Sequence, residues 1–352
     1  PTPQAIKDGR RFLYDAKLSG NGTMSCASCH VDGDIDLIAW DLGDPAGNLD
    51  PTPFQPFPFS QFLQANFHPM KGPMTTQTLR GLNGITKLHW RGDRANLAAF
   101  NPAFASLLGG TPLGASDLAL FTGFMSAIEF PPNPNQLNDR TLSATPVNNN
   151  ANEGLHVFQN TIVPGFVPGQ NLTCTVCHTL PLGTVNMILS GTIIQQSQGL
   201  KAPQLRNMYR KVGASATGVA KSGFGFLHDG ATATVAEFLA TAIFANWPAA
   251  KKDDLETFVM AFDTGTAPTV GYQVTVDSTN ATNALVGLDI TLLQNEALLG
   301  NCDLIVKGTV GGVPRGFYYL ASSGIYLPDD SSLGLFSWSG LQGLAQTGQA
   351  VL

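Results

Sequence analysis

The sequence contains the pentapeptide Cys26-Ala-Ser-Cys29-His30 and a second copy of the same pattern, Cys174-Thr-Val-Cys177-His178. In a Cys-x-x-Cys-His unit, the two thiols can form thioethers to the vinyl groups of a haem, and the histidine that follows is placed to be the proximal iron ligand. Two Cys-x-x-Cys pairs could also make a four-thiolate zinc site, and one pair beside a βαβ pattern could be a thioredoxin-like redox pair. Neither alternative requires a histidine after both second cysteines. The sequence therefore predicts two covalently bound haem c groups, attached at Cys26, Cys29, Cys174 and Cys177, with His30 and His178 as proximal ligands.

The composition indicates which partners and compartment to expect. The chain has 352 residues, a formal net charge of -6 and 12% charged residues, about half the usual share. It offers no basic patch for nucleic acid, and no run of apolar residues is long enough to predict a transmembrane segment. The chain begins at Pro1 without a methionine or a signal peptide, which suggests a processed mature protein or a fragment of a longer one. Because haem c is attached outside the bacterial cytoplasm, we expect a periplasmic or extracellular protein.

The two motifs lie inside a longer internal repeat. An opening helix, with Pro3 at its first helical position, carries Gly9 and Leu13, and the second copy has Gly154 and Phe158 at the matching places. A closing helix follows in both copies, with apolar residues at helical spacing from 117 to 125 and from 254 to 262. Helix, haem motif, loop and closing helix is the order expected of a cytochrome c domain.

The repeat predicts a mainly α protein of two tandem cytochrome c-type haem domains, residues 1–145 and 146–268. The stretch from Pro131 to Asn150 is rich in Pro and Asn and is expected to be the linker. Residues 269–352 change to an alternating, β-prone pattern, which predicts a small accessory domain of mixed or mainly β character. A Pro- and Phe-rich stretch from Pro51 to Phe62 is expected to be an ordered loop that lies over apolar surface.

Two further segments carry a resemblance to a known family. They are Gly72-Pro73-Met74-Thr75-Thr76-Gln77-Thr78-Leu79-Arg80 and Phe226-Leu227-His228-Asp229-Gly230. Together with the haem motifs, they resemble the bacterial di-haem cytochrome c peroxidase and methylamine-utilisation family, in its extracytoplasmic subgroup. The resemblance covers about residues 1–268. It implies that the two haem domains face each other and that one haem passes electrons to the other.

The resemblance also implies roles for particular residues of the first domain. His68 falls where the family has a switchable distal ligand, and Trp90 falls where a tryptophan lies between the haems, so Trp90 is a candidate electron relay. The family's peroxidatic glutamate would fall near Gly110, where the only acidic residue between 94 and 128 is Asp117. Because a proton-transferring group contributes about a hundred- to ten-thousand-fold in rate, we expect peroxidase activity to be weak without one.

The second domain departs from the family too. Ala242 stands where the family's methionine ligand would lie. His228 lies far enough along the chain from His178 to be a distal ligand of the second haem, and it is the candidate for that place. Met70, Met74, His89 and Met208 are alternative ligands. By their equivalent places, Arg80 and Arg206 are candidates to bind haem propionates. Calcium between the domains is possible by resemblance but is not predicted, because Gly225 replaces the proline expected at the second site.

These features leave three functions open. The main hypothesis is an extracytoplasmic di-haem c-type cytochrome that carries out electron transfer between redox donor and acceptor proteins. The first alternative is an enzyme, a di-haem cytochrome c peroxidase-like oxidoreductase that reduces hydrogen peroxide. The second is a haem subunit of an extracellular electron-conducting assembly, with self-association or docking through residues 269–352.

Overall fold

The computed structural model describes residues 2–52, 66–144, 149–165, 170–212 and 225–352. These residues belong to two compact units, each with its own core. The first unit comprises 1–131 and 142–265, which we call its N-terminal and C-terminal halves. The second unit comprises 132–141 and 266–352, so part of the expected linker packs with the second unit. Most of the loop expected at 51–62 lies outside the described residues.

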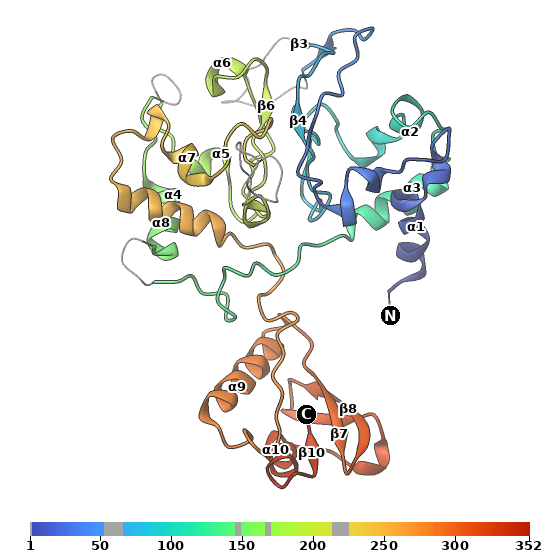
Figure 1. Cartoon of the computed structure of the whole chain (residues 1–352), viewed down its shortest axis with the longest axis vertical. Coiled ribbons are helices and arrows are strands. Elements are labelled where there is room, and N and C mark those ends of the chain that lie inside the picture. The colour runs from blue at the N-terminus through green and yellow to red at the C-terminus, as the bar shows by residue number, and fades with distance from the viewer. Residues whose placement is uncertain (1, 53–65, 145–148, 166–169, 213–224) are drawn as a thin grey trace. The chain divides into compact units, whose positions relative to one another are not determined.

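The N-terminal half is built around two crossing helices, α1 (Gln4–Tyr14) and α3 (Ala115–Ser126) (Figure 1). Phe12 and Leu13 of α1 pack against Phe121 and Met125 of α3, and all four side chains are buried. The remaining elements of this half are α2 (Ala103–Ser106), β1 (Ala39–Trp40), β2 (Asp50–Pro51), β3 (Asn66–Phe67) and β4 (Met74–Thr75), with β1 antiparallel to β4 and β2 antiparallel to β3.

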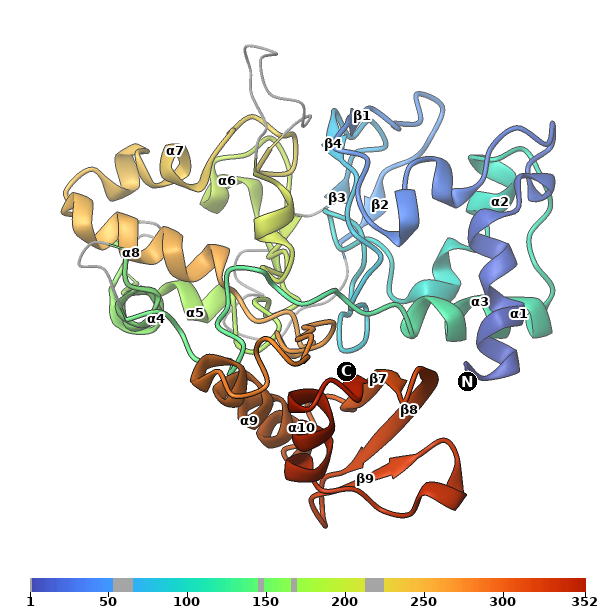
Figure 2. The same cartoon turned by 60° about the horizontal axis from the view of Figure 1, so that its bottom comes forward.

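The C-terminal half repeats this arrangement with α4 (Ala151–Asn160) and α8 (Ala249–Met260) (Figures 1 and 2). Phe158 contacts Phe258 and Phe262, with ring centroids 5.2 Å and 6.3 Å apart, so an aromatic cluster fills the crossing. The other elements are α5 (Cys174–Cys177), α6 (Gly191–Ile194), α7 (Val235–Leu239), β5 (Ile188–Leu189) and β6 (Leu200–Lys201), with β5 antiparallel to β6.

The second unit is a four-stranded antiparallel sheet packed with two helices. The strands β7 (Ile305–Val310), β8 (Val313–Leu320), β9 (Ile325–Pro328) and β10 (Ala350–Val351) lie in the order β10-β7-β8-β9. The helices are α9 (Ala284–Leu298) and α10 (Trp338–Gln346). Phe317, Tyr326 and Leu341 are almost completely buried in its core. The chain is thus mainly helical, with its longer strands in the second unit.

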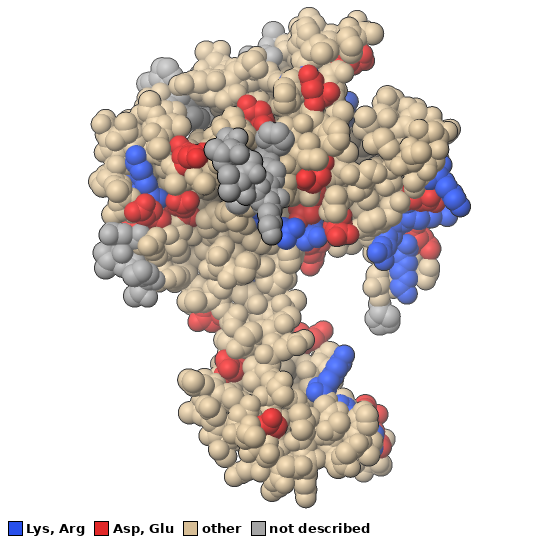
Figure 3. Space-filling view, in the orientation of Figure 1, with Lys and Arg blue, Asp and Glu red and all other residues tan. Residues whose placement is uncertain are grey.

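The surface carries few charged side chains, as the low share of charged residues in the sequence suggests. The face drawn in Figure 3 is mostly uncharged, with small groups of both signs scattered over it. None of the helices in the described part of the chain is long and apolar enough to cross a membrane.

The repeated glycines of the opening helices lie where the helices cross. A Cβ at Gly9 would clash with the carbonyl oxygen of Leu120 in α3, and a Cβ at Gly154 would clash with that of Asp254 in α8. Because neither obstacle is a flexible side chain, only glycine lets the two backbones approach this closely. The repeat is therefore a repeat of helix-crossing geometry as well as of motifs.

Gly9→Ala is expected to destabilise the protein by about 1 to 3 kcal/mol, since the added methyl group must push α1 away from α3. The measurement is the melting temperature of the haem-loaded protein. Gly123→Ala is the matched control, because Gly123 lies in α3 with open space around it and alanine favours a helix by about 0.5 to 1 kcal/mol over glycine. Equal effects of the two changes would contradict the crossing as the cause.

Candidate functional site

The first Cys-x-x-Cys-His motif forms a single tight turn. Cys26–Ser28 is a 3-10 turn whose ends are joined by reciprocal bonds between Ser25 and Ser28. Since residues three apart lie on the same side of such a turn, both thiols face one way. The backbone N–H of His30 donates to the carbonyl of Cys26 at 3.0 Å, which folds the histidine back under the turn. Burial raises the pKa of Cys26 to about 11, so its thiol is neutral at pH 7.

The second motif has the same geometry in the C-terminal half. Cys174 to Cys177 form the short helix α5, and the N–H of His178 donates to the carbonyl of Cys174 at 2.9 Å. Burial raises the pKa values of both thiols to about 11. All four motif cysteines are free thiols, and within the described residues no three or more Cys, His, Asp or Glu side chains gather where they could hold a metal ion. The structure therefore gives no support to a four-thiolate zinc site.

The imidazole of His178 is oriented as a metal ligand. Its Nδ1 lies 2.9 Å from the carbonyl oxygen of Gly183 and 3.1 Å from that of Pro203. Because both partners are acceptors, Nδ1 carries the proton and Nε2 keeps its lone pair, which is the tautomer that binds iron through Nε2. Burial lowers the pKa of His178 and so favours the neutral ring. The residues of this motif fit a covalently bound haem.

Nδ1 of His30 is buried, and the imidazole of His89 acts on His30 electrostatically. Burial lowers the pKa of His30, and the neighbouring His89 lowers it further. Nδ1 of His30 lies near the backbone of Gln77 and Asp34, but it is buried without a hydrogen bond of good geometry. Because its imidazole acts on His30 and carries no motif of its own, His89 is a candidate second ligand for a metal bound at the first motif.

His89 is held in place from both sides. Its Nδ1 lies 2.9 Å from Oδ1 of Asp93, and its ring packs edge-on against Phe100 at 4.6 Å between centroids. Its backbone takes a φ of 68°, which is uncommon for a residue other than glycine and turns the side chain sharply. Since a carboxylate accepts the proton of Nδ1, Nε2 of His89 is free to bind a metal.

Asp93 is an anion within a small charged cluster. Burial alone would raise its pKa, but the bond from His89 and the charges of Arg94 and Arg91 outweigh burial and hold the pKa well below its usual range. Both arginines lie 3.4 Å from Oδ2 of Asp93. The carboxylate thus keeps its charge at neutral pH and fixes the orientation of His89.

Other residues predicted as ligands of the first haem lie elsewhere. His68 is exposed, and its Nδ1 accepts a bond from the backbone N–H of Met70 at 3.1 Å. Met70 is 43% exposed, and Met74 lies in β4 opposite Trp40. Asp117, the one acid near the family's glutamate position, lies on α3 and is 3.4 Å from Arg11 of α1.

Trp90 is buried at the contact between the two halves of the first unit. Its indole N–H donates to the carbonyl of Thr75 at 2.7 Å, and its own carbonyl accepts from the N–H of Lys201 in the C-terminal half. Its ring lies edge-on to His228 at 6.5 Å. The N–H of Thr75 donates in turn to the carbonyl of His228 at 2.6 Å. The tryptophan is therefore in contact with both halves.

The candidates of the C-terminal half have protein partners. His228 is buried, which lowers its pKa, and its ring faces Trp90. Met208 is partly buried and packs against the same apolar cluster as Cys174. The arginines predicted to bind propionates make bonds across the contact: Arg206 donates to the carbonyl of Gly81 and lies over the ring of Phe130, while Arg80 and Arg210 share the buried Asp34.

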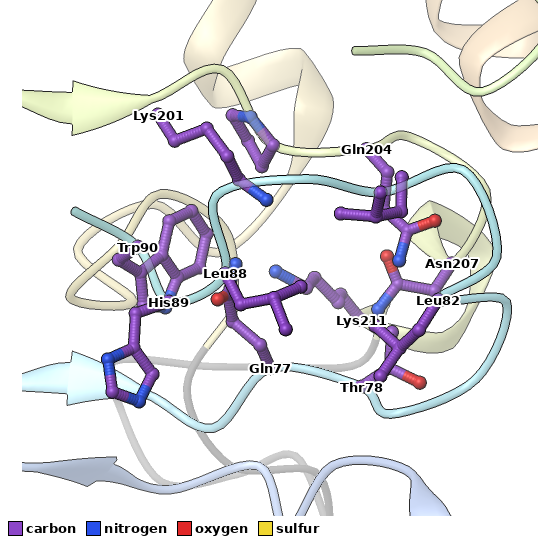
Figure 4. A pocket seen from close by; sticks show the side chains of 12 residues that line it. Gln77, Thr78, Leu82, Leu88, His89, Trp90, Lys201, Gln204, Asn207 and Lys211 are labelled. Carbon is purple, nitrogen blue, oxygen red and sulfur yellow. The ribbon is translucent and has the colours of Figure 1, made fainter. Parts of the chain in front are cut away.

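A pocket between the halves contains two lysines that the sequence did not single out. Figure 4 shows Lys201 and Lys211 pointing into it beside Trp90, with amide side chains around them. Both lysines are buried, and burial lowers both pKa values to about 8. No residue spacing marks either lysine, because β6 and the turn after Met208 meet only in the folded chain.

Comparison with known proteins identifies the N-terminal half. Residues 3–103 match the family model described as di-haem cytochrome c peroxidase. This part of the chain is therefore similar to the di-haem cytochrome c peroxidase family. The family implies haem c as cofactor, and the turn at Cys26 and the two imidazoles behind it fit this cofactor. No curated protein matches the chain.

Several solved structures are similar to this chain. A chain of hydrazine synthase from Kuenenia stuttgartiensis is 15% identical, with a TM-score of 0.51 over 74% of this chain and 88% of that one. A MauG-like protein associated with microbial copper homeostasis is 16% identical (TM-score 0.45, 74% and 88% covered). The diheme peroxidase BthA from Burkholderia thailandensis is 18% identical (TM-score 0.38, 76% and 89% covered). The first of these likenesses shows a shared fold.

Asp93→Asn is expected to lower the stability of the haem-loaded protein at pH 7 by about 3 kcal/mol, because it leaves Arg91 buried without its anion. The folded pKa of Asp93 is below its unfolded value, so the carboxylate stabilises the fold above pH about 4 and this stabilisation is lost as the pH falls further. Thermal unfolding from pH 7 to pH 3 should show the difference between variant and wild type shrinking below pH about 4.

The control is Asp253→Asn, at an exposed position of α8, which should change stability little at any pH. A difference between Asp93→Asn and wild type that is the same at pH 3 as at pH 7 would show that the charge of Asp93 is not what stabilises the fold.

Proposed function

We propose that this chain is an extracytoplasmic di-haem c-type cytochrome that transfers electrons between a redox donor and an acceptor protein. When bound, haem c supplies a one-electron redox couple at each motif. The observation that carries the proposal is Trp90, which is buried in contact with both halves of the first unit. Its place supports the role of an electron relay between the two haem sites.

The surroundings of the first motif support a haem with histidine on both faces. His30 would be the proximal ligand, and His89 would be the distal one, since its Nε2 is free and its Nδ1 is bound to Asp93. His68 is exposed, and its Nδ1 already accepts a backbone bond. Two imidazoles give a low-spin iron of lower potential with no open face, which suits electron transfer.

The second haem would be attached at Cys174 and Cys177 with His178 as its proximal ligand. His228 as its distal ligand stays a prediction, with Met208 as the alternative. The edge-on contact of His228 with Trp90 supports an electron path from this side of the first unit to the tryptophan.

The second unit is the candidate docking domain. Helix α9 exposes Leu285, Leu288 and Leu298, each by more than 60% of its surface. Exposed apolar side chains on one helix favour association with another surface. This supports the prediction that residues 269–352 dock on a partner or on a second copy, as an electron-conducting assembly would require.

A peroxidase that reduces hydrogen peroxide is the second candidate, and the comparisons favour it over a simple electron carrier because the family matched by residues 3–103 is named for this reaction. Asp117 cannot supply the missing acid from the surface pair it forms with Arg11. His89, however, is oriented by Asp93. Beside a haem held at the first motif, it could take the peroxide proton, a role suited to a histidine oriented by a carboxylate.

Trp90→Leu is expected to slow electron transfer between the two haems, because it removes the aromatic ring between the two sites. The measurement is the rate of interhaem equilibration after a pulse that reduces one haem. Trp247→Leu is the matched control, since Trp247 packs on Phe244 in the core of the C-terminal half. Equal rates in both variants and the wild type would contradict the relay.

His89→Gly and His68→Gly distinguish the two candidate ligands. For the haem-loaded protein, His89→Gly is expected to convert one ferric haem from low spin to high spin and to speed its reaction with peroxide, while His68→Gly leaves the spectrum unchanged. Optical spectra of the ferric proteins provide the measurement. A high-spin haem in His68→Gly and an unchanged spectrum in His89→Gly would restore His68 as the ligand.

A further inference from the structure

We propose that the pocket between the two halves binds a carboxylate group between Lys201 and Lys211. The proposal rests on the proposed function, since one source of such a group is a haem propionate. The pocket is lined by residues that belong to the two candidate sites: His89, a candidate ligand of the first haem, and Pro203, whose carbonyl accepts the proton of His178. An anion bound there would lie beside Trp90.

The two lysines are buried, and their positions are fixed by contacts with Trp90. Lys201 is 4% exposed and lies in β6, where its backbone N–H donates to the carbonyl of Trp90. Lys211 is 9% exposed, and its ammonium lies 5.2 Å from the centre of the Trp90 ring. Both ammonium groups point into the same space (Figure 4).

The lysines carry more positive charge than the described surroundings balance. Within the described residues, Asp34 is the one carboxylate whose charge acts on Lys211, and none acts on Lys201. Asp34 is itself shared by Arg80 and Arg210, at 3.8 Å and 3.2 Å. A buried ammonium without a counter-ion destabilises the fold, so the fold is more stable with an anion between the two lysines.

The other groups around the pocket suit a carboxylate. Gln77, Gln204 and Asn207 line the space with amide N–H donors, and Thr78 adds a hydroxyl. Two ammonium groups and several neutral donors can bind both oxygens of a carboxylate at once. Each haem c brings two propionate carboxylates, while a small free carboxylate from solution is the other possible source.

The expected consequence is an effect on redox potential. A fixed positive charge near a haem stabilises its reduced, less positive form, so Lys201→Met or Lys211→Met should lower the midpoint potential of at least one haem. We expect a shift of the reduction equilibrium by about tenfold, which is about 59 mV for a one-electron couple. The probe is spectroelectrochemical titration of the full haem-loaded chain in chloride and in acetate at equal ionic strength.

The two sources give different results. If a propionate occupies the pocket, the potential falls in the lysine variants and does not depend on acetate. If a free carboxylate occupies it, the wild-type potential changes with acetate concentration and the variants lose that dependence. Both results support the site. Potentials that match the wild type in every variant, with no acetate dependence, would overturn it.

Controls separate charge from folding and from the proposed function. Lys17→Met makes the same change at an exposed position and should leave the potentials unchanged. Lys201→Arg and Lys211→Arg keep the positive charge, so they should keep the wild-type potential. If the arginine variants lower the potential as much as the methionine variants do, the charge has no role. Haem content is measured in the same samples: fewer than two haems in the wild type would count against the proposed function, whereas two haems with unshifted potentials would count against the lysine site alone.

Discussion

The contact around Trp90 is the interaction on which the arrangement of the first unit depends. Each half of this unit has its own pair of crossing helices and its own haem motif, so each could form a core by itself. Bonds of two kinds hold the halves together at this contact. Backbone hydrogen bonds join Lys201 to Trp90 and Thr75 to His228. Two arginine side chains of the C-terminal half also bind the N-terminal half: Arg206 donates to the carbonyl of Gly81, and Arg210 forms an ion pair with Asp34. Because many of these groups are buried, the contact is fixed and the distance between the haem sites is fixed with it.

The sequence was most informative where a local pattern sets local structure. The opening and closing helices follow from helical spacing of apolar residues, and they occur at Gln4–Tyr14 and Ala115–Ser126, and again at Ala151–Asn160 and Ala249–Met260. The paired glycines Gly9 and Gly154 were visible as a repeat. Their role in the close approach of two helix backbones needed the structure, because the partner residues, Leu120 and Asp254, lie far from the glycines along the chain.

The ligand environment was harder to predict, for a physical reason. Distance along the chain from a family motif pointed to His68, but a ligand is chosen by the direction of its side chain. The bond to Asp93 fixes the orientation of the His89 imidazole, while Arg91 donates to the backbone carbonyl of His68, whose side chain is exposed, and neither arrangement can be read from spacing along the chain. Lys201 and Lys211 carry no motif at all. Their pairing arises from burial at the contact between the halves, which a linear pattern does not encode.

For the proposed haem with two histidine ligands, the balance between electron transfer and peroxide reduction would depend on whether His89 remains a ligand. A low-temperature electron paramagnetic resonance spectrum of the fully oxidised protein, followed by that of the half-reduced protein, tests this most directly. Two low-spin ferric signals, with the survivor unchanged after one-electron reduction, are the result predicted for an electron carrier with His30 and His89 on one haem. A high-spin signal that appears on half-reduction would contradict this account, because it would show a distal ligand leaving its iron as in an activated peroxidase.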